Sequence, residues 1–312
     1  MHGPGNCSAD GPHVPLFAAP RPPRSASALS AELLGPGGAE AAPVLAGAAR
    51  SLANLQPGLP VFATMVFGHM AQYLASFGER VRDLRIPNVV VFVLDDRAEK
   101  ACLKVKGAAS TDRGQAITCL VGMGRTALQK YVVVLAYVSL GWDVLWFDFD
   151  SVWLKNPVPA VRAAEAAAAK GSGPPPQVLA AIDVDSKNCV MNAFFWIKAT
   201  TEMRSWLLSL LHWLYKRPYA HDQLGFALLL GMGPLVDDEP LPTPPPWVPL
   251  DPNIFANAAK FSGLGFTSEL EDLVLFHFFD GWNSNQPEEV EQWTTPLYRG
   301  ENLFEVLYGH DA

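Results

Sequence analysis

Residues 141–157 read Gly141-Trp-Asp-Val-Leu-Trp-Phe-Asp-Phe-Asp-Ser-Val-Trp-Leu-Lys-Asn-Pro157. The apolar run within this stretch predicts a strand over 143–147 that is covered on both faces. Asp148 and Asp150 follow the strand at positions i and i+2, and they project to the same side of an extended chain. Two carboxylates placed in this way can share one hard cation, which in turn can bind phosphate oxygens. The stretch therefore predicts a metal site just beyond a buried strand.

Strand-like and helix-like patterns alternate on both sides of this stretch. Strands are predicted over 60–67, 88–94, 143–147, 178–182, 193–197 and 273–278, and helices over 69–84, 125–140, 157–170, 200–215 and 222–230. This alternation predicts an α/β fold with a mostly parallel, Rossmann-like sheet and helices on both faces. In such sheets ligands bind beyond the carboxyl ends of the strands, where Asp95, Asp148 and Asp150 all fall.

The composition is that of a folded chain with an acidic balance. Of the 312 residues, 49% are hydrophobic and 17% are charged, so enough apolar surface is present to form a core. The formal net charge of −8 argues against a nucleic-acid partner bound through a broad basic surface. The cysteines, at positions 7, 102, 119 and 189, are too scattered for a disulfide framework or a zinc site. We therefore expect them to be thiols.

The chain divides by composition into two parts. Residues 1–56 are rich in Ala, Pro, Gly and Ser, which predicts a disordered tail or stem, with room for a short Ala-rich helix between 30 and 55. Residues 57–312 are predicted to form one domain. The chain contains no uncharged apolar run of the ~18 residues that a membrane span requires, and its N-terminus lacks the pattern of a signal peptide.

Several stretches, taken together and in this order, resemble the nucleotide-diphospho-sugar transferase family with the GT-A fold. The resemblance is strongest to the group that contains plant and algal arabinosyl- and xylosyltransferases, and it extends from about residue 61 to residue 282. The matching stretches are Val-Val-Phe-Val-Leu-Asp95, Ala-Leu-Gln-Lys130, the block around Asp148 and Asp150, Asn192-Ala-Phe-Phe-Trp-Ile-Lys-Ala-Thr200, His221-Asp-Gln223 and Phe276-His-Phe-Phe-Asp-Gly-Trp282.

The resemblance implies a role for each residue that matches the family's donor site. Asp95 would hold the nucleoside, and Lys130 would face the donor phosphates. Asp148 would contact the ribose or a metal-bound water, and Asp150 would bind the metal itself. Asn192 would line the donor sugar.

The later matching stretches imply further site residues. Asp222 would bond the hydroxyls of the donor sugar, and Gln223 would lie near the anomeric carbon. His277 would be the third metal ligand, although a lone His on an apolar strand face also fits simple core packing. The lysine that the family often carries after this point is absent, since Asn283-Ser-Asn285 stands there.

The resemblance further implies an enzyme that uses Mn²⁺ (or Mg²⁺) to move a sugar from a UDP-sugar or similar donor to a hydroxyl of a glycan or glycoprotein. It implies retention of the anomeric configuration and a location in the Golgi lumen. Two alternatives stay open at this point. Asp148 and Asp150 also fit the nucleophile and the acid/base of a haloacid-dehalogenase-type phosphatase, and a GT-A-like domain can serve as a non-catalytic partner subunit. A second Asp-x-Asp pair, Asp183 and Asp185, is predicted to matter less than the first.

Overall fold

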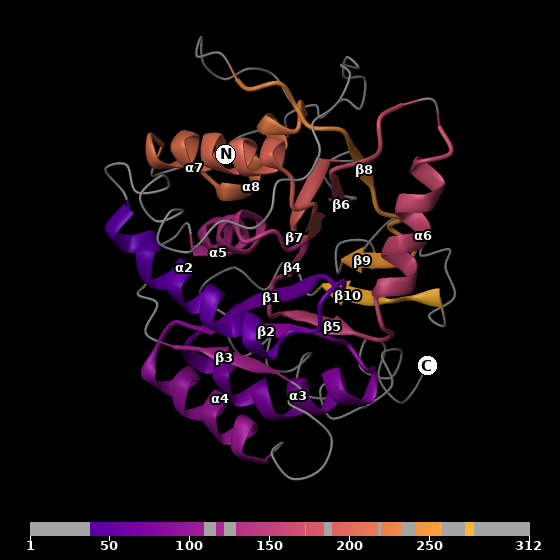
Figure 1. The fold of residues 1–312 in the computed structure, drawn as a ribbon. Coiled ribbons are helices and arrows are strands. Elements are labelled where there is room, and N and C mark those ends of the chain that lie inside the picture. The colour runs from indigo at the N-terminus through magenta and orange to yellow at the C-terminus, as the bar shows by residue number, and fades with distance from the viewer. Residues whose placement is uncertain are drawn as a thin grey trace, which may run out of the picture.

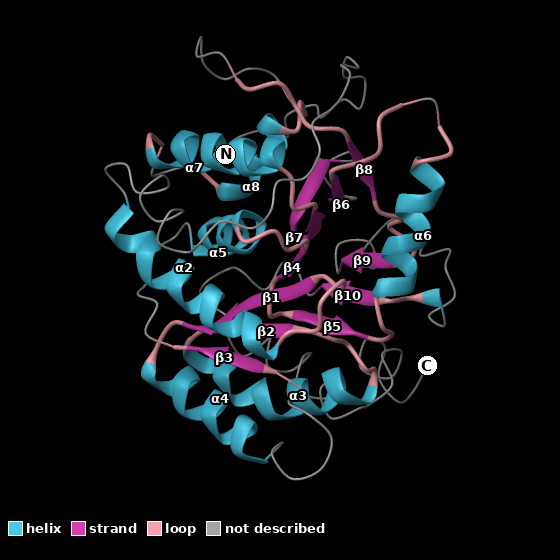
Figure 2. Cartoon of the chain, in the orientation of Figure 1, coloured by secondary structure: helices cyan, strands magenta, loops and turns pink. Residues whose placement is uncertain are grey.

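The computed structural model of the chain describes residues 38–108, 117–121, 129–171, 173–183, 189–217, 220–232, 241–257 and 272–277. These residues form a seven-stranded sheet, a smaller three-stranded sheet, and helices on both faces of the larger sheet (Figure 1). Figure 2 shows how strands and helices alternate along most of the described chain.

The large sheet has the strand order β3-β2-β1-β4-β7-β6-β8. Its strands are β1 (Val61–Val66), β2 (Val89–Val93), β3 (Thr118–Leu120), β4 (Val144–Phe147), β6 (Val178–Asp183), β7 (Cys189–Ile197) and β8 (Trp247–Pro249). β7 runs antiparallel to its neighbours β4 and β6, and every other pairing in the sheet is parallel. The predicted mostly parallel α/β sheet is confirmed.

Helices cover each face of this sheet because successive side chains of the strands point in opposite directions. Along β1, Val61 and Ala63 pack on one side with α2 (Gly38–Ser51), α5 (Gln129–Ser139), α7 (Thr201–Tyr215) and α8 (Asp222–Leu229). Phe62 and Val66 pack on the other side with α3 (Leu74–Asp83), α4 (Asp96–Ala108) and α6 (Val158–Ala168). Two short 3₁₀ helices, η1 (Leu52–Asn54) and η2 (Gly68–Tyr73), flank β1.

The small sheet begins where the large one ends. β5 (Ser151–Trp153) starts one residue after Asp150 and pairs antiparallel with β10 (Leu275–His277), which pairs in parallel with β9 (Phe255–Asn257). Aromatic side chains join the two sheets. Phe194 of β7 stacks on Phe255 and meets the edge of Trp153, with ring centroids 4.9 and 5.5 Å away. This packing fixes β10 beside the Asp-x-Asp stretch.

Local chemistry explains where the helices begin and end. Thr200 caps α7, since its Oγ1 accepts a hydrogen bond from the Met203 N–H at 3.1 Å. Gly141 and Gly231 follow α5 and α8 with φ of +84° and +81°, a left-handed conformation that favours glycine.

The segment predicted as a tail contains a helix that packs on the domain. Of residues 1–56, those from 38 onward are described, and residues 38–51 form α2. Its Val44, Leu45 and Ala48 are buried in the same core as α5. The packed part of the chain therefore begins before residue 57, while a stem over residues 1–37 lies outside the described residues.

The expectation of thiols is wrong for two of the cysteines. Cys102 of α4 and Cys119 of β3 form a disulfide, with an S–S distance of 2.04 Å and Cα atoms 6.0 Å apart. A single bond between a helix and an edge strand depends on how the two elements pack, so the spacing of cysteines in the sequence does not predict it. Disulfides persist mainly in oxidising compartments.

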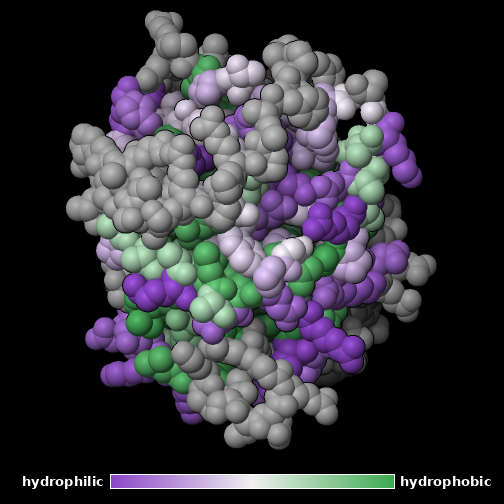
Figure 3. All heavy atoms as spheres, viewed as in Figure 1, coloured by the Kyte–Doolittle hydropathy of each residue, from purple (hydrophilic) through white to green (hydrophobic). Residues whose placement is uncertain are grey.

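The described part of the surface carries both polar and apolar residues. Hydrophilic and hydrophobic residues are interspersed over the described part of the face in Figure 3. Within the described ranges, every helix is too short or too polar to span a lipid bilayer.

Candidate metal and donor site

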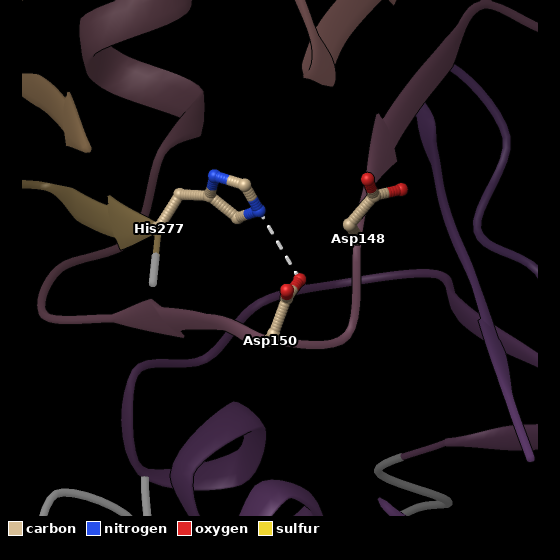
Figure 4. A group of neighbouring side chains, drawn as sticks. All are labelled: Asp148, Asp150 and His277. Carbon is tan, nitrogen blue, oxygen red and sulfur yellow. Dashed lines mark ion pairs between the residues drawn. The ribbon is translucent and has the colours of Figure 1, made fainter. Parts of the chain in front are cut away.

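The three predicted metal ligands converge beyond the carboxyl end of β4. One ligand atom from each of Asp148, Asp150 and His277 lies within 4.8 Å of the other two. Figure 4 shows the imidazole of His277 pointing toward Asp150, with Asp148 beside them. The His277 Nε2 is 3.2 Å from Asp150 Oδ1. The imidazole is 3% exposed and the Asp150 side chain 12%, so both groups are largely shielded from water.

Strand pairing explains why His277 reaches this place. In the antiparallel pairing of β10 with β5, His277 lies opposite Ser151, the residue that follows Asp150. Bonds from divalent cations to oxygen are about 2.0–2.6 Å long, so two ligands of one ion lie at most about 4–5 Å apart. The spacing of Asp148, Asp150 and His277 fits a single ion.

A buried lysine lies on the other side of Asp148. Lys130, in the first turn of α5, has its Nζ 3.0 Å from Asp148 Oδ1 and 3.6 Å from Asp222 Oδ2. The Nζ also donates a hydrogen bond to the backbone carbonyl of Asn192 at 3.2 Å. The lysine side chain is 6% exposed. Lys130 thus joins the metal-side carboxylate to Asp222, and direct contact with donor phosphates stays a prediction.

Trp146 is a site residue that the sequence reasoning missed. Its indole Nε1–H donates a hydrogen bond to Asp148 Oδ1 at 2.8 Å. Trp146 and Asp148 stand at i and i+2 of one strand and its extension, so they point to the same side, where α5 lies. That alternation was available in the sequence and could have identified Trp146 as a partner of Asp148.

Asn192 and Asp222 lie beside Lys130, at the point where β7 and α8 approach α5. Asn192 is 4% exposed, and its Nδ2 donates to the Tyr131 hydroxyl at 2.8 Å. Asp222 is the first residue of α8, and its Oδ1 accepts from the Gln223 N–H at 2.9 Å. The structure therefore brings together Lys130, Asp148, Asn192 and Asp222. Tyr131 is a second residue that the sequence reasoning missed.

Asp95 lies at the same edge of the sheet, at the end of β2. Its carboxylate accepts hydrogen bonds from the backbone N–H groups of Gly68, at 2.5 Å, and Ala98, at 2.8 Å. It thus joins the turn after β1 to the start of α4, as a helix-capping aspartate does. Contact with a nucleoside stays a prediction for Asp95, as does the place of Gln223 near the anomeric carbon.

Other predicted features fall outside the described residues. Asp183 closes β6, but Asp185 is not described. Residues 278–285, which contain the end of the last matching stretch and Asn283-Ser-Asn285, are also outside the described ranges.

Burial and neighbouring charges together shift the pKa values of the clustered groups. Burial raises the pKa of Asp148 above its usual range and Asp150 adds to the effect, although Lys130 opposes it. Burial alone would lower the pKa of Lys130, but Asp148 and Asp222 outweigh it, and the pKa stands above its ordinary value. Burial likewise opposes the charged form of His277, yet Asp150 raises the pKa of the imidazole above its ordinary value.

Comparisons with known proteins agree with this geometry. The model of the nucleotide-diphospho-sugar transferase family matches residues 84–235. An arabinosyltransferase of Arabidopsis thaliana is 28% identical over 103 residues, which cover 30% of this chain and 16% of that protein. The chain thus corresponds to a small part of the length of this relative.

Solved glycosyltransferase structures are similar at low identity. A galactosyltransferase in complex with donor and acceptor sugar analogues has a TM-score of 0.43 at 12% identity, covering 73% of this chain and 94% of that one. The glycosyltransferase GlyE of Streptococcus pneumoniae has a TM-score of 0.48 at 12% identity, covering 80% and 62%. Mouse xyloside xylosyltransferase has a TM-score of 0.40 at 10% identity, covering 73% and 99%.

The mostly parallel sheet with an Asp-x-Asp stretch at its carboxyl edge agrees with the GT-A type of fold. The family match covers the strand and helices that carry Asp95, Lys130, Asp148, Asn192 and Asp222. Residues 84–235, just under half of the 312-residue chain, thus resemble the nucleotide-diphospho-sugar transferase family.

Replacement of His277 by alanine is expected to weaken Mn²⁺ binding at least about tenfold and Mg²⁺ binding much less. A neutral imidazole is a good ligand for Mn²⁺, whereas Mg²⁺ prefers oxygen ligands. Titration of each metal into the purified protein, followed by calorimetry, measures both affinities. His212→Ala is the matched control, because His212 is an exposed histidine of α7. An equal loss for both metals in His277→Ala would show that His277 does not ligate.

Metal binding by the unaltered protein should also depend on pH. If His277 is a ligand, the cation must displace the proton from its imidazole, whose pKa is raised above 6.5 in the metal-free protein. Mn²⁺ affinity should therefore fall as the pH drops through this raised pKa.

The folding stability of the metal-free protein should have the opposite pH dependence and fall as the pH rises. The contribution of the protonated imidazole is fully present below pH 6.5 and is lost as the pH rises through the raised pKa. Thermal unfolding in EDTA at a series of pH values measures this contribution to stability.

Proposed function

We propose that this domain is a metal-dependent glycosyltransferase that moves a sugar from a nucleotide-diphosphate donor, such as a UDP-sugar, to a hydroxyl of a glycan or glycoprotein. The observation that carries the proposal is the convergence of Asp148, Asp150 and His277 at the carboxyl edge of the sheet. Lys130 pairs with both Asp148 and Asp222, so the group that we assign to the cation lies beside the carboxylate that we assign to the sugar.

The donor set fits a divalent cation. Two carboxylates and an imidazole favour Mn²⁺ over Mg²⁺, since Mg²⁺ rarely takes nitrogen ligands. Asp150 and His277 would hold the ion, and Asp148 would hold the ribose or a metal-bound water. When bound, the cation supplies Lewis-acid stabilisation of the diphosphate that leaves with negative charge. Lys130 keeps Asp148 oriented from the opposite side at 3.0 Å.

The sugar end of the donor would lie against Asn192, Asp222 and Gln223. Asn192 and Asp222 offer an amide and a carboxylate, groups that bind sugar hydroxyls, and Gln223 follows Asp222 at the start of α8. We propose that the acceptor hydroxyl attacks from the face that the diphosphate leaves, which retains the anomeric configuration. The product anomer, read by NMR spectroscopy, tests this part separately.

A panel of nucleotide sugars with Mn²⁺ and with EDTA tests the function. Calorimetry should show binding of at least one UDP-sugar that disappears in EDTA, and release of UDP should follow when a suitable acceptor is added. An arabinose donor is the first to try, because the similar plant protein is an arabinosyltransferase. Binding without turnover of any donor would favour a non-catalytic partner subunit.

The same assay separates the phosphatase alternative. That mechanism needs Asp148 as a nucleophile, but Asp148 Oδ1 accepts a hydrogen bond from Trp146 and pairs with Lys130. Both contacts hold the carboxylate as an oriented ligand. Hydrolysis of phosphomonoesters in the absence of any nucleotide-sugar binding would nevertheless establish the phosphatase.

We propose that the domain works in an oxidising lumen such as that of the Golgi apparatus. The Cys102–Cys119 disulfide supports this location, because cytosolic thiols are kept reduced. Localisation of the protein against a Golgi marker, together with a thiol-labelling assay on the freshly isolated protein, tests both points.

A further inference from the structure

One buried hydroxyl joins the two residues that we assign to the donor sugar. Tyr131 of α5 receives a hydrogen bond from Asn192 Nδ2 at 2.8 Å and donates one to the backbone carbonyl of Asp222 at 3.3 Å. Tyr131 is fully buried, and Asn192 is 4% exposed. Asn192 belongs to β7 and Asp222 to α8, so the hydroxyl ties together elements that are distant in the sequence.

The number of protons sets the direction of these hydrogen bonds. A tyrosine hydroxyl has one proton to give and lone pairs with which to accept. Its proton goes to the Asp222 carbonyl, so toward Asn192 the oxygen can only accept. The amide of Asn192 must therefore turn its NH₂ group to Tyr131 and its Oδ1 away from it.

We propose that Tyr131 is a positioning residue that fixes the Asn192 amide so that its Oδ1 accepts a hydrogen bond from a hydroxyl of the donor sugar. This inference rests on the proposed function and adds a selection rule to it. The donor must carry a hydroxyl at the sugar position that meets Asn192, and a sugar with hydrogen there is bound more weakly.

Removal of the hydroxyl should leave the rest of the site in place. The Tyr131 ring is stacked with Phe195 and with Phe226, with centroids 6.3 and 6.0 Å away and an angle of 18° between the planes in both cases. Lys130 holds the backbone carbonyl of Asn192 independently. A phenylalanine at position 131 can therefore keep the ring packing while the amide of Asn192 loses its fixed orientation.

The test compares Tyr131→Phe with the unaltered protein in the presence of Mn²⁺. Calorimetry gives the Kd for UDP and the Kd for the UDP-sugar that the unaltered protein prefers. The ratio of the two Kd values should shift about tenfold in favour of UDP in the variant, because one hydrogen bond of a buried group is lost. Donor analogues with single hydroxyls replaced by hydrogen add a second readout. One such analogue should bind the unaltered protein about tenfold more weakly than its parent, yet bind Tyr131→Phe as well as its parent does.

Tyr137→Phe provides a matched control on the same helix. Tyr137 is also fully buried, and its hydroxyl lies 2.7 Å from Ser51 Oγ, on the side of α2. This variant loses a buried hydroxyl of the same kind and should show an unchanged Kd ratio. If Tyr131→Phe also leaves the ratio unchanged, or if the two variants shift it equally, the positioning role is wrong. If the unaltered protein binds UDP with Mn²⁺ but no analogue discriminates, this inference alone fails, whereas the absence of any nucleotide binding overturns the proposed function as well.

Discussion

Replacement of Asp150 by alanine is expected to lower kcat/KM by at least about a hundredfold and to abolish metal-dependent donor binding. Asp150 is the carboxylate closest to His277, and its side chain is 12% exposed. Loss of this ligand should remove the cation, and with it the charge stabilisation that the leaving diphosphate requires. Calorimetry with Mn²⁺ and UDP measures binding, and release of UDP measures turnover.

Two variants control for the loss of a carboxylate as such. Asp143 precedes β4 at the opposite end of the strand, where it pairs with Lys198 at 3.3 Å, so Asp143→Ala should leave metal binding unchanged. Asp183→Ala belongs to the second Asp-x-Asp pair and should do less harm than Asp150→Ala. Equal losses from Asp150→Ala and Asp183→Ala would mean that the metal has been assigned to the wrong pair.

Replacement of Lys130 by methionine should destabilise the metal-free protein by about 3 kcal/mol, because a buried pair loses one partner. In the unaltered protein the Lys130 Nζ lies 3.0 Å from Asp148 and 3.6 Å from Asp222. Without this ammonium group the two carboxylates would face each other with no positive charge between them. Urea unfolding in EDTA measures the loss. Mn²⁺ should restore part of the stability, since the ion brings positive charge back to Asp148, and Mn²⁺ alone should bind more tightly than in the unaltered protein.

Lys198→Met is the matched control for Lys130→Met. Lys198 also pairs with two carboxylates, those of Asp143 and Glu165, but on the far side of the sheet. The substitution Lys198→Met should therefore lower the free energy of unfolding without any change in Mn²⁺ affinity. Unchanged or weaker Mn²⁺ binding in Lys130→Met would contradict the placement of Lys130 beside a metal ligand.

The part of the site that follows from local patterns was predictable. Alternation along the strand before Asp148 places both aspartates at the carboxyl edge of the sheet. The helix predicted before this strand begins near the same edge, which places Lys130 there. The same alternation would have found Trp146. Helical spacing was also present at Ala98, Cys102 and Val105, which form the inner side of α4. The predicted helices nevertheless did not include α4 (Asp96–Ala108).

Other parts depend on packing between distant segments, which a sequence pattern does not encode. His277 meets Asp150 only because a three-residue strand pairs with β5 across more than a hundred residues of chain. The antiparallel direction of β7 and the Cys102–Cys119 bond have the same origin. Tyr131 gave no signal, since a buried tyrosine on an apolar helix is ordinarily just core.

The packing of α2 on α5 limits how this domain can be transplanted. Val44, Leu45 and Ala48 cover α5, and Ser51 meets Tyr137 on the helix whose first turn holds Lys130 and Tyr131. A chimera joined at residue 57 would lack α2, and the apolar side chains of α5 that α2 covers would be exposed to solvent. Such an exposed apolar surface favours aggregation. Engineers who wish to exchange donor preferences between related enzymes should therefore place the junction ahead of residue 38.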